Sequence, residues 1–322
     1  MTDIRHHEGV VPLALAGKRL DQALAALFDD YSRTLLSTWI REGRVRLNGR
    51  VCRPREPVAA GDTVALSAVL AASADAVPEA IDFGVVVEDR EVIVVDKPAG
   101  LVVHPGAGNH AHTLVNGLLH RWPELAALPR AGLIHRLDKD TSGLLVVART
   151  PRAFQRLTAL MAAREIHRTY QALVHGIVVT GGTVDAAIAR DRQQRTRMRV
   201  IEGGREAVTH YKVLKKFRAH TLLEIQLETG RTHQIRVHLQ YIGSPIVGDP
   251  DYGFRRRLPP GATPALGAAL QGLRRQALHA CRLAFPHPGG RKTVAAESAL
   301  TADFAALLTA LSDDAAAARQ AP

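Results

Sequence analysis

The chain has 322 residues, which is long enough for two domains with separate cores. Its formal net charge of +11 favours a polyanionic partner, and only 4% of its residues are aromatic, so any base contacts would depend on few rings. The two cysteines have no metal-like spacing, which argues against a disulfide framework or a zinc site and fits a reducing compartment, the cytoplasm. Neither a signal peptide nor a membrane-spanning run is visible, so no membrane partner is expected.

The N-terminal part predicts a small α/β domain. Apolar residues at helical spacing cover 18–28, and a second helix is expected to begin at Ser32 and to end near Gly43. Residues 45–51 predict a hairpin with Asn-Gly in its turn, and 62–66 predict a closing strand. Two short helices and a small sheet in this order resemble the compact S-four-like RNA-binding domain.

Basic residues are expected along the helix-and-hairpin face of this domain. They are Lys18, Arg19, Arg33, Arg41, Arg44 and Arg46. The alternative is a merely solvated basic surface, but charges gathered on one face of a basic chain favour RNA binding.

The chain is expected to divide at an alanine-rich segment without periodicity, 71–80. We predict the N-terminal domain at 1–75, a linker at 76–84, a second domain at 85–312 and a flexible tail at 313–322. In the second domain, strands are expected at 85–89, 91–96, 144–148, 167–174, 223–227 and 277–288, and helices at 113–119, 151–165 and from Thr232 to Gly243.

The stretch from His135 to Gly143 places an acid on a turn ahead of an apolar strand. Residues 144–148 contain no polar side chain, so we expect a strand that is buried on both faces. Asp138 would then lie on a loop held by rigid core, where chemical groups are commonly placed. The alternative is that Asp138 or Asp140 only closes an Asx-turn.

These motifs resemble a known enzyme family. His-Arg-Leu-Asp at 135–138, followed by Thr-Ser-Gly, is similar to the active-site signature of the RluA family of pseudouridine synthases. Thr-Gly-Arg-Thr-His-Gln-Ile-Arg at 229–236 and Val-Gly-Asp-Pro at 247–250 extend the resemblance. The resemblance implies an α+β fold, with a mixed and mainly antiparallel β-sheet and flanking helices beside the S-four-like domain.

The resemblance also implies roles for individual residues. Asp138 would be the catalytic nucleophile, and Arg231 would pair with it and keep it ionised. Tyr170 would lie against the target uracil, and His135 and Arg136 would bind RNA. The plainer alternatives are that Tyr170 is a half-buried strand aromatic and that Arg231 satisfies a loop carbonyl.

The implied reaction converts uridine to its C-glycoside, which needs no cofactor or metal. The sequence accordingly lacks a Gly-rich phosphate loop, a His-Glu-x-x-His motif and cysteine pairs. A uridine inside RNA must leave the stack to reach Asp138, at a cost of a few kcal/mol.

Within the family, the chain resembles the D-type branch, which acts on large-subunit (23S) ribosomal RNA. The alternatives are the C-type branch, a synthase acting on tRNA, and a non-catalytic RNA-binding or ribosome-assembly factor. A metal-dependent nuclease using Asp138, Asp140 and His135 is a further rival, but no second carboxylate cluster accompanies these residues. The sequence does not fix the oligomeric state, and a monomer is expected.

Overall fold

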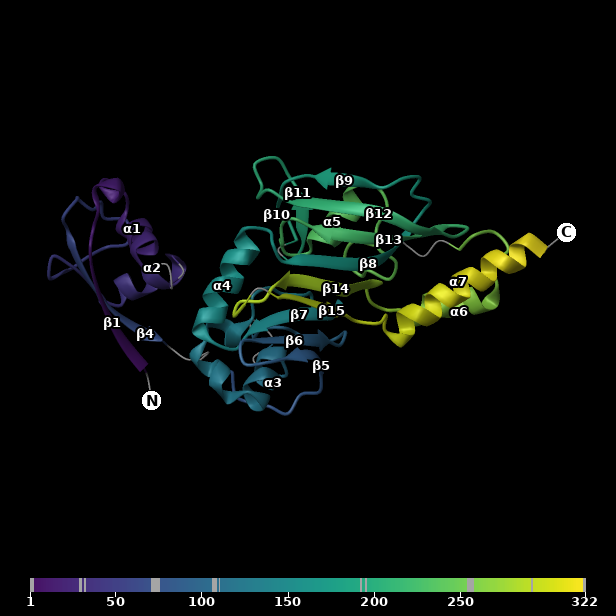
Figure 1. The fold of residues 1–322 in the computed structure, drawn as a ribbon. Helices are drawn as coiled ribbons and strands as arrows, with labels where there is room; N and C mark the ends of the chain where they lie inside the picture. Colours follow the sequence, from purple (N-terminus) through teal and green to yellow (C-terminus); the bar gives the residue numbers. More distant parts are fainter. Residues whose placement is uncertain are drawn as a thin grey trace. The chain divides into compact units, whose positions relative to one another are not determined.

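The computed structural model describes residues 3–28, 31, 33–70, 76–105, 109, 111–191, 193–194, 196–253, 258–290 and 292–320. The chain divides into two compact units, one ending at Ala74 and one beginning at Asp75 (Figure 1). Ser32, the expected helix cap, and residues 71–75 of the expected linker lie outside the described residues. No helix in the described ranges combines the length and hydropathy needed to cross a bilayer.

The N-terminal unit packs two helices on a small antiparallel sheet. Its elements are β1 (Asp3–Val10), a 3-10 helix (Leu13–Leu15), α1 (Leu20–Leu27), α2 (Arg33–Arg41), β2 (Val45–Leu47), β3 (Arg50–Val51) and β4 (Thr63–Leu70). The strand order is β1-β4-β2-β3. Asn48 and Gly49 have φ of 51° and 76°, so the β2–β3 turn has the left-handed residues that an Asn-Gly hairpin requires.

Strand β1 was not expected from the sequence. It pairs with β4 over eight residue pairs at the edge of the sheet. Its residues Asp-Ile-Arg-His-His-Glu-Gly-Val are mostly polar, so they lack the regular apolar alternation that marks a half-buried strand.

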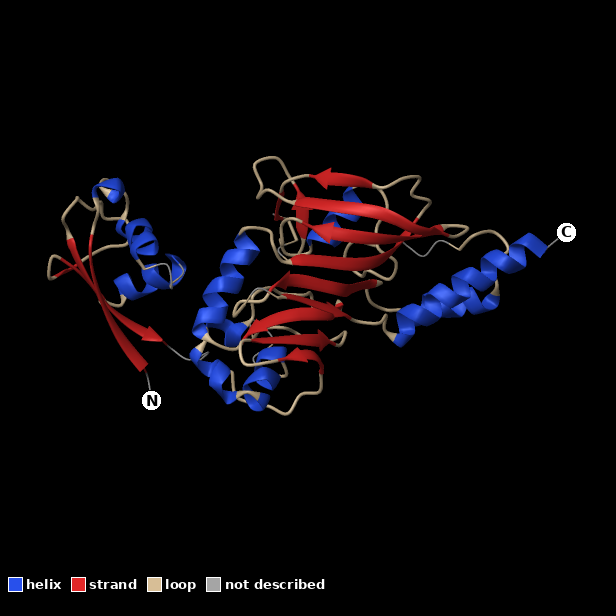
Figure 2. Cartoon of the chain, in the orientation of Figure 1, coloured by secondary structure: helices blue, strands red, loops and turns tan. Residues whose placement is uncertain are grey.

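The second unit is built on one nine-stranded sheet (Figure 2). The strand order is β5-β6-β7-β14-β8-β13-β12-β9, and β15 pairs with β14. Among the described strands of this sheet only the β7–β14 pair is parallel, so the expected mixed and mainly antiparallel α+β fold is confirmed. The strands are β5 (Gly84–Glu88), β6 (Val92–Lys97), β7 (Ser142–Ala148), β8 (His167–His175), β9 (Gly182–Asp185), β12 (Val208–Lys216), β13 (His220–Leu227), β14 (Leu278–Pro286) and β15 (Thr293–Glu297), beside a two-stranded sheet of β10 (Ile188–Arg190) and β11 (Met198–Val200).

Helices cover this sheet, and α6 and α7 pack together beyond one end of its strands (Figure 1). The helices are α3 (Leu114–Arg121), α4 (Pro151–Ala162), α5 (Gln234–Tyr241), α6 (Pro264–Gly272) and α7 (Ala302–Gln320), with 3-10 turns at Pro123–Ala127 and Pro129–Gly132. The expected flexible tail differs from the structure, because α7 continues to Gln320. Asp314 is buried there, bonded to Arg218 and to the backbone N–H of Thr263.

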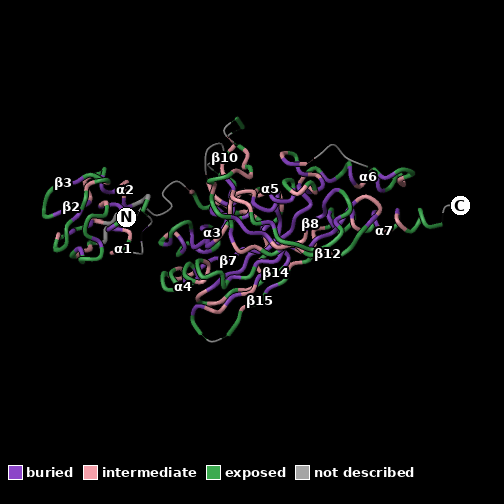
Figure 3. The backbone as a smooth tube through the Cα atoms, turned by 90° about the horizontal axis from the view of Figure 1, so that it is seen from above, coloured by how far each residue is buried: buried purple, intermediate pink, exposed green. Residues whose placement is uncertain are grey.

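Strand β7 lies in the middle of the core and is buried on both faces, as predicted (Figure 3). Leu145 and Val147 belong to the apolar cluster that includes α3. Leu144 and Val146 belong to the cluster on the other face, which includes α4. The loop that precedes β7 is therefore anchored at one end in rigid core.

Gly143 makes the parallel contact between β7 and β14 possible. The strands pair only through His279 with Ser142 and Ala280 with Gly143. At Gly143 φ is 110°, and a Cβ atom would lie 2.3 Å from the carbonyl oxygen of Ala280. Only glycine permits both this conformation and this approach.

Two fully buried histidines give a paired test of stability. Both ring nitrogens of His238 are hydrogen-bonded, to Thr209 Oγ1 and to the carbonyl of Ala186, each at 2.9 Å. Neither ring nitrogen of His220 has a hydrogen-bond partner within the described part of the chain. We expect His238→Leu to lower the free energy of unfolding by about 2–4 kcal/mol and His220→Leu to change it by less than about 1 kcal/mol. Urea denaturation at pH 7 measures both values.

The same pair predicts a pH dependence. Burial lowers the pKa of His220 to about 4, whereas the unfolded side chain titrates near 6.5. Between these values the unfolded state binds more protons, so stability falls as the pH falls. From pH 7 to pH 5, His220 should lower the free energy of unfolding of the wild type by about 2 kcal/mol, and His220→Leu should not show this loss. Equal pH slopes in the two proteins would contradict the assignment.

Candidate active site

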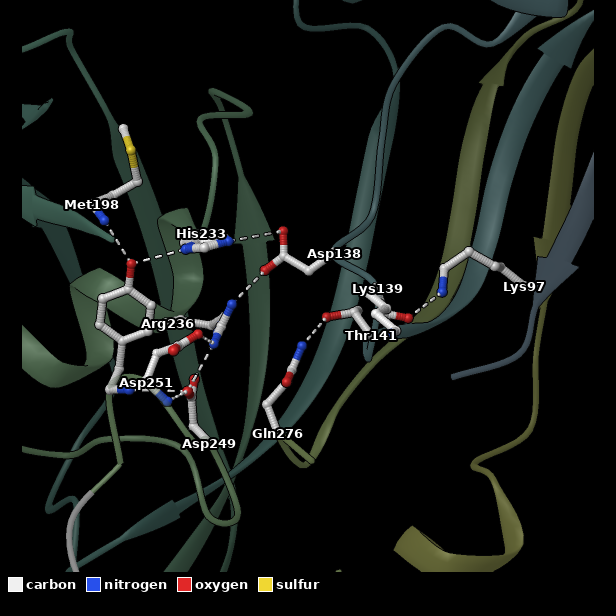
Figure 4. Close-up of polar contacts among 11 residues, drawn as sticks. Lys97, Asp138, Lys139, Thr141, Met198, His233, Arg236, Asp249, Asp251 and Gln276 are labelled. Atoms are coloured by element: carbon white, nitrogen blue, oxygen red, sulfur yellow. Dashed lines mark hydrogen bonds and ion pairs between the residues drawn. The ribbon is translucent and has the colours of Figure 1, made fainter. Parts of the chain in front are cut away.

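The loop carrying Asp138 is held at one side by a buried ammonium group. Lys97, which is fully buried, donates from Nζ to the carbonyls of Pro98, Leu101 and Lys139 at 2.8 to 2.9 Å. Figure 4 shows the bond to Lys139. Gly100 N–H donates to the same Lys139 carbonyl at 3.0 Å. Burial lowers the pKa of Lys97 to about 7. These contacts fix the main chain immediately after Asp138.

The other side of the loop is held by the segment that precedes β14. Arg275 donates to the carbonyl of Asp140 at 3.3 Å, and Gln276 Nε2 donates to Thr141 Oγ1 at 3.0 Å. Thr141 N–H donates to the main-chain oxygen of Asp138 at 3.1 Å, so the turn is closed without the carboxylate. In the described ranges no backbone N–H donates to the Asp138 carboxylate, which is 17% exposed and free to face a ligand.

The guanidinium beside Asp138 is that of Arg236, on α5. Arg236 Nη1 lies 3.2 Å from Asp138 Oδ2. Its Nε and Nη2 bond the two oxygens of Asp249 at 2.7 and 2.8 Å, and Nη2 also bonds Asp251 at 2.7 Å (Figure 4). Burial alone would lower the pKa of Arg236, but the bonds to Asp249 raise it above its ordinary value, so the cation is retained.

The predicted pairing of Asp138 with Arg231 is therefore wrong. Arg231 Nε donates to the main-chain carbonyl of Glu206 at 2.9 Å, which is the plainer alternative that the sequence had left open. Thr232 is not the N-cap of the helix either, because α5 begins at Gln234 with His233 as its N-cap. Arg236 lies inside the helix, on the face turned to the loop. Arg236 stands in the same 229–236 motif as Arg231, but the sequence analysis gave it no role.

Asp138, Tyr170 and Arg231 line one cavity of about 630 Å³, together with Arg168 and Arg236. Tyr170 lies on β8 and is 3% exposed, and burial raises the pKa of its hydroxyl. A second cavity of about 400 Å³ also reaches Asp138 and shares His104, Arg136 and His233 with the first. The three predicted catalytic residues are thus brought together around one hollow, although Arg231 does not touch Asp138.

The larger cavity carries an excess of positive charge. Its carboxylates are Asp138, Glu206 and Glu228, and its arginines are Arg130, Arg136, Arg164, Arg168, Arg231 and Arg236. Arg164 pairs with both glutamates. Arg168 is only 7% exposed, its Nε has no hydrogen-bond partner, and no carboxylate pairs with it among the described residues. A buried cation without a counter-ion suits an anionic ligand.

Two of the three histidines that line the cavity, His135 and His104, are uncharged at neutral pH. His135 Nε2 accepts the N–H of Val146 at 3.4 Å, and burial lowers its pKa to about 3. Burial likewise lowers the pKa of His104 to about 4. His135 can therefore contact RNA only as a neutral group, whereas Arg136 is exposed and charged. Within the described ranges no group of three or more histidine, cysteine or acidic side chains is arranged to hold a metal ion.

On the N-terminal unit, half of the six predicted RNA-binding residues meet in one hollow of about 840 Å³. Arg19, Arg33 and Arg41 line it, and Arg19 and Arg33 both pair with Asp21. Lys18, Arg44 and Arg46 are not among its lining residues, and Arg44 instead pairs with Glu42. The sequence analysis missed Arg53 and Arg55, which line the hollow from the segment after the hairpin. Their signal was the Arg-Pro-Arg sequence between the predicted hairpin and the predicted closing strand.

Comparison with known proteins shows which family the chain belongs to. Residues 91–241 match the RNA pseudouridylate synthase family, and residues 18–64 match the S4 domain. The ribosomal large subunit pseudouridine synthase D of Xanthomonas campestris is 52% identical over 313 residues, covering 97% of this chain and 95% of that protein. The protein of the same name from Escherichia coli K12 is 50% identical over 273 residues, covering 84% of each.

Among solved structures, human RNA pseudouridylate synthase domain containing 4 superposes with a TM-score of 0.57. It is 27% identical and covers 71% of this chain and 93% of that chain. The chain belongs to the RNA pseudouridine synthase family. It is an RNA-modifying enzyme whose N-terminal unit is an S4 domain.

The two arginines of the 229–236 motif can be separated by mutation. Arg236→Gln removes the cation shared by Asp138 and Asp249, so we expect a loss of about 3–5 kcal/mol in the free energy of unfolding, and a loss of activity. Arg231→Gln removes one bond to a carbonyl at a half-exposed site and should cost less than about 1.5 kcal/mol. Denaturant melts and activity on RNA would check both variants. Equal destabilisation would contradict the assignment of Arg236.

Proposed function

We propose that this enzyme isomerises specific uridines of large-subunit ribosomal RNA to pseudouridine, with Asp138 acting on a flipped-out nucleotide. The observation that carries the proposal is the Asp138–Arg236 pair, which lines a cavity together with Tyr170 and an excess of arginines. The substrate follows from the relatives at 50% identity and more, which are named for the ribosomal large subunit. The alternatives are another uridine site in the manner of the C-type branch, or tRNA.

The proposed reaction breaks one bond of the ribose and forms another. The bond between ribose C1′ and uracil N1 breaks, the free uracil turns, C1′ bonds to C5, the proton on C5 is released, and N1 takes up a proton. Asp138 either attacks C1′ or removes a ribose proton, and both routes need an ionised carboxylate. Arg236 bonds one oxygen of that carboxylate and so fixes its orientation in the cavity.

Tyr170 would hold the freed uracil by stacking on its face. Because burial raises the pKa of its hydroxyl, that group keeps its proton at neutral pH and would relay a proton rather than carry negative charge. Everting the nucleotide costs a few kcal/mol. Arg130, Arg136, Arg168 and Arg231, which have no carboxylate partners among the described residues, would offset part of this cost through the RNA backbone.

The S4 unit would add phosphate contacts and orient the RNA. We retain the proposed division into an RNA-binding domain at 1–75 and a catalytic domain at 85–312, but residues 76–83 belong with the catalytic unit. Asn116 bonds the carbonyl of Val77, and Phe83 is buried there. We expect the protein to be a monomer. We also expect it in the cytoplasm, where ribosomal RNA is modified, because both cysteines are buried and free, as in a reducing compartment.

The test of Asp138 is tritium release from RNA labelled at C5 of uridine. Asp138→Asn keeps the size of the side chain but removes its charge, so release should fall by at least about 10³-fold, the scale of loss when a nucleophile or its charge is removed. Asp140→Asn, two residues away, is the matched control and should retain wild-type release. Equal release by wild type and Asp138→Asn would show that the assignment is wrong. RNA binding without any release would favour a non-catalytic assembly factor.

The substrate is tested by mapping pseudouridines in the RNA of a deletion strain. Loss of sites in large-subunit ribosomal RNA, restored by the wild-type gene and not by Asp138→Asn, is the expected result. Loss of pseudouridines confined to tRNA would show that the substrate is tRNA, and the proposed chemistry would still stand.

Salt dependence tests the hollow of the S4 unit. Replacing Arg41, Arg53 and Arg55 by alanine should weaken RNA binding and reduce the slope of log K against log salt by about 2, at about 0.7 for each lost phosphate contact. Arg44→Ala, outside the hollow, is the control and should change the slope little. Filter binding between 50 and 200 mM salt covers the range over which such slopes are measured.

A further inference from the structure

His233 directly precedes α5 and has a left-handed backbone conformation, which a residue at the start of a helix does not need. It is the N-cap of α5, where an extended backbone and a short polar side chain are usual. Its φ and ψ are instead 56° and 19°, in the left-handed region, and its side chain makes no capping bond. Such a conformation costs a non-glycine residue about 1–3 kcal/mol and is found mainly at functional sites. The result is an imidazole that lines both cavities beside Asp138.

Tyr252 determines which nitrogen of this ring carries the proton. The Tyr252 oxygen accepts the N–H of Met198 at 2.7 Å and lies 2.8 Å from His233 Nδ1 (Figure 4). Burial raises the pKa of Tyr252 to about 12, so its hydroxyl keeps its proton, and among the described residues Nδ1 is the one acceptor within hydrogen-bond distance of it. Burial also lowers the pKa of His233, which keeps the ring neutral. The remaining proton must then be on Nε2, the nitrogen that faces Asp138.

The donor and the carboxylate face each other without touching. His233 Nε2 is 4.0 Å from Asp138 Oδ1, beyond hydrogen-bond length, while Arg236 bonds the other oxygen, Oδ2. A hydroxyl oxygen about 2.8 Å from both atoms could accept from Nε2–H and donate to Oδ1. A nucleotide inside an RNA chain has one free ribose hydroxyl, the 2′-OH, because its 3′ and 5′ oxygens are esterified.

We propose that His233 Nε2–H and Asp138 Oδ1 together bind the 2′-OH of the target nucleotide, so that His233 orients the ribose against the catalytic acid and selects ribose over deoxyribose. The 2′-OH is the group by which a protein distinguishes RNA from DNA at a given position. This inference rests on the proposed function, since it needs a uridine everted into the cavity.

The test is a binding cycle that involves no reaction. The probe is an RNA fragment that the enzyme modifies, already carrying pseudouridine at the target, with either ribose or 2′-deoxyribose at that one position. Wild type should bind the deoxy probe about two- to ten-fold more weakly, the net value of one hydrogen bond. His233→Asn should bind both probes equally, because asparagine tolerates the left-handed backbone but does not reach the position of Nε2.

Two further variants and a control complete the cycle. His233→Gln places an N–H near the position of Nε2 and should recover part of the preference. Tyr252→Phe keeps the aromatic ring but removes the hydroxyl that fixes the tautomer of His233. It should therefore reduce the preference for the ribose probe. His120→Asn, at an exposed site on α3, should match wild type. An equal preference in wild type and His233→Asn, an unchanged preference in Tyr252→Phe, or no preference in wild type would each overturn the inference.

The two proposals fail in different ways. If wild type forms no pseudouridine from uridine in the unmodified RNA, the proposed function fails. If pseudouridine forms but the ribose preference does not depend on His233, the function stands and only the role of His233 is lost.

Discussion

One guanidinium organises the site. Arg236 bonds Asp138, Asp249 and Asp251 at once, so three carboxylates share a single cation that is almost fully buried. Asp249, whose side chain is fully buried, holds the arginine through two parallel bonds, which leaves one nitrogen to face Asp138. Asp138, which faces the cavity, is therefore positioned by Arg236, and Arg236 is itself held in place by Asp249. The geometry of Asp138 depends on this chain of contacts more than on its own turn.

The rest of the fold supplies the rigidity that this arrangement needs. Strand β7 is buried along its whole length, and the loop before it is held by Lys97 on one side and by Arg275 and Gln276 on the other. Every one of these contacts leaves the Asp138 carboxylate free, since they bind main-chain carbonyls or the hydroxyl of Thr141. Rigid main chain around a free acid is what a reactive group requires when it must meet a substrate atom within fractions of an ångström.

Much of this could be read from the sequence, and the failures have physical causes. The strand predicted at 144–148 and the helix predicted at 151–165, which ends at Ala162 in the structure, were found because burial imposes a plain apolar pattern. Arg231 was paired with Asp138 from the family resemblance, and Arg236 was not considered. Arg236 lies in α5, whose N-cap His233 has a conformation that propensity would not assign to it. Edge strand β1 was missed because pairing, rather than its own residues, makes it a strand. Arg53 and Arg55 were missed because they act only through their place in the folded unit.

The narrow parallel contact at Gly143 divides the large sheet into two antiparallel parts, β5-β6-β7 and the strands from β14 onward. Asp138 enters from the first part, whereas Arg236 and Tyr170 come from the second. The group of residues proposed for catalysis is consequently complete only when the two halves are in register across this seam. A change anywhere along the seam should lower the activity before it unfolds either half. Activity would therefore detect a disturbed β7–β14 contact more sensitively than any melting curve.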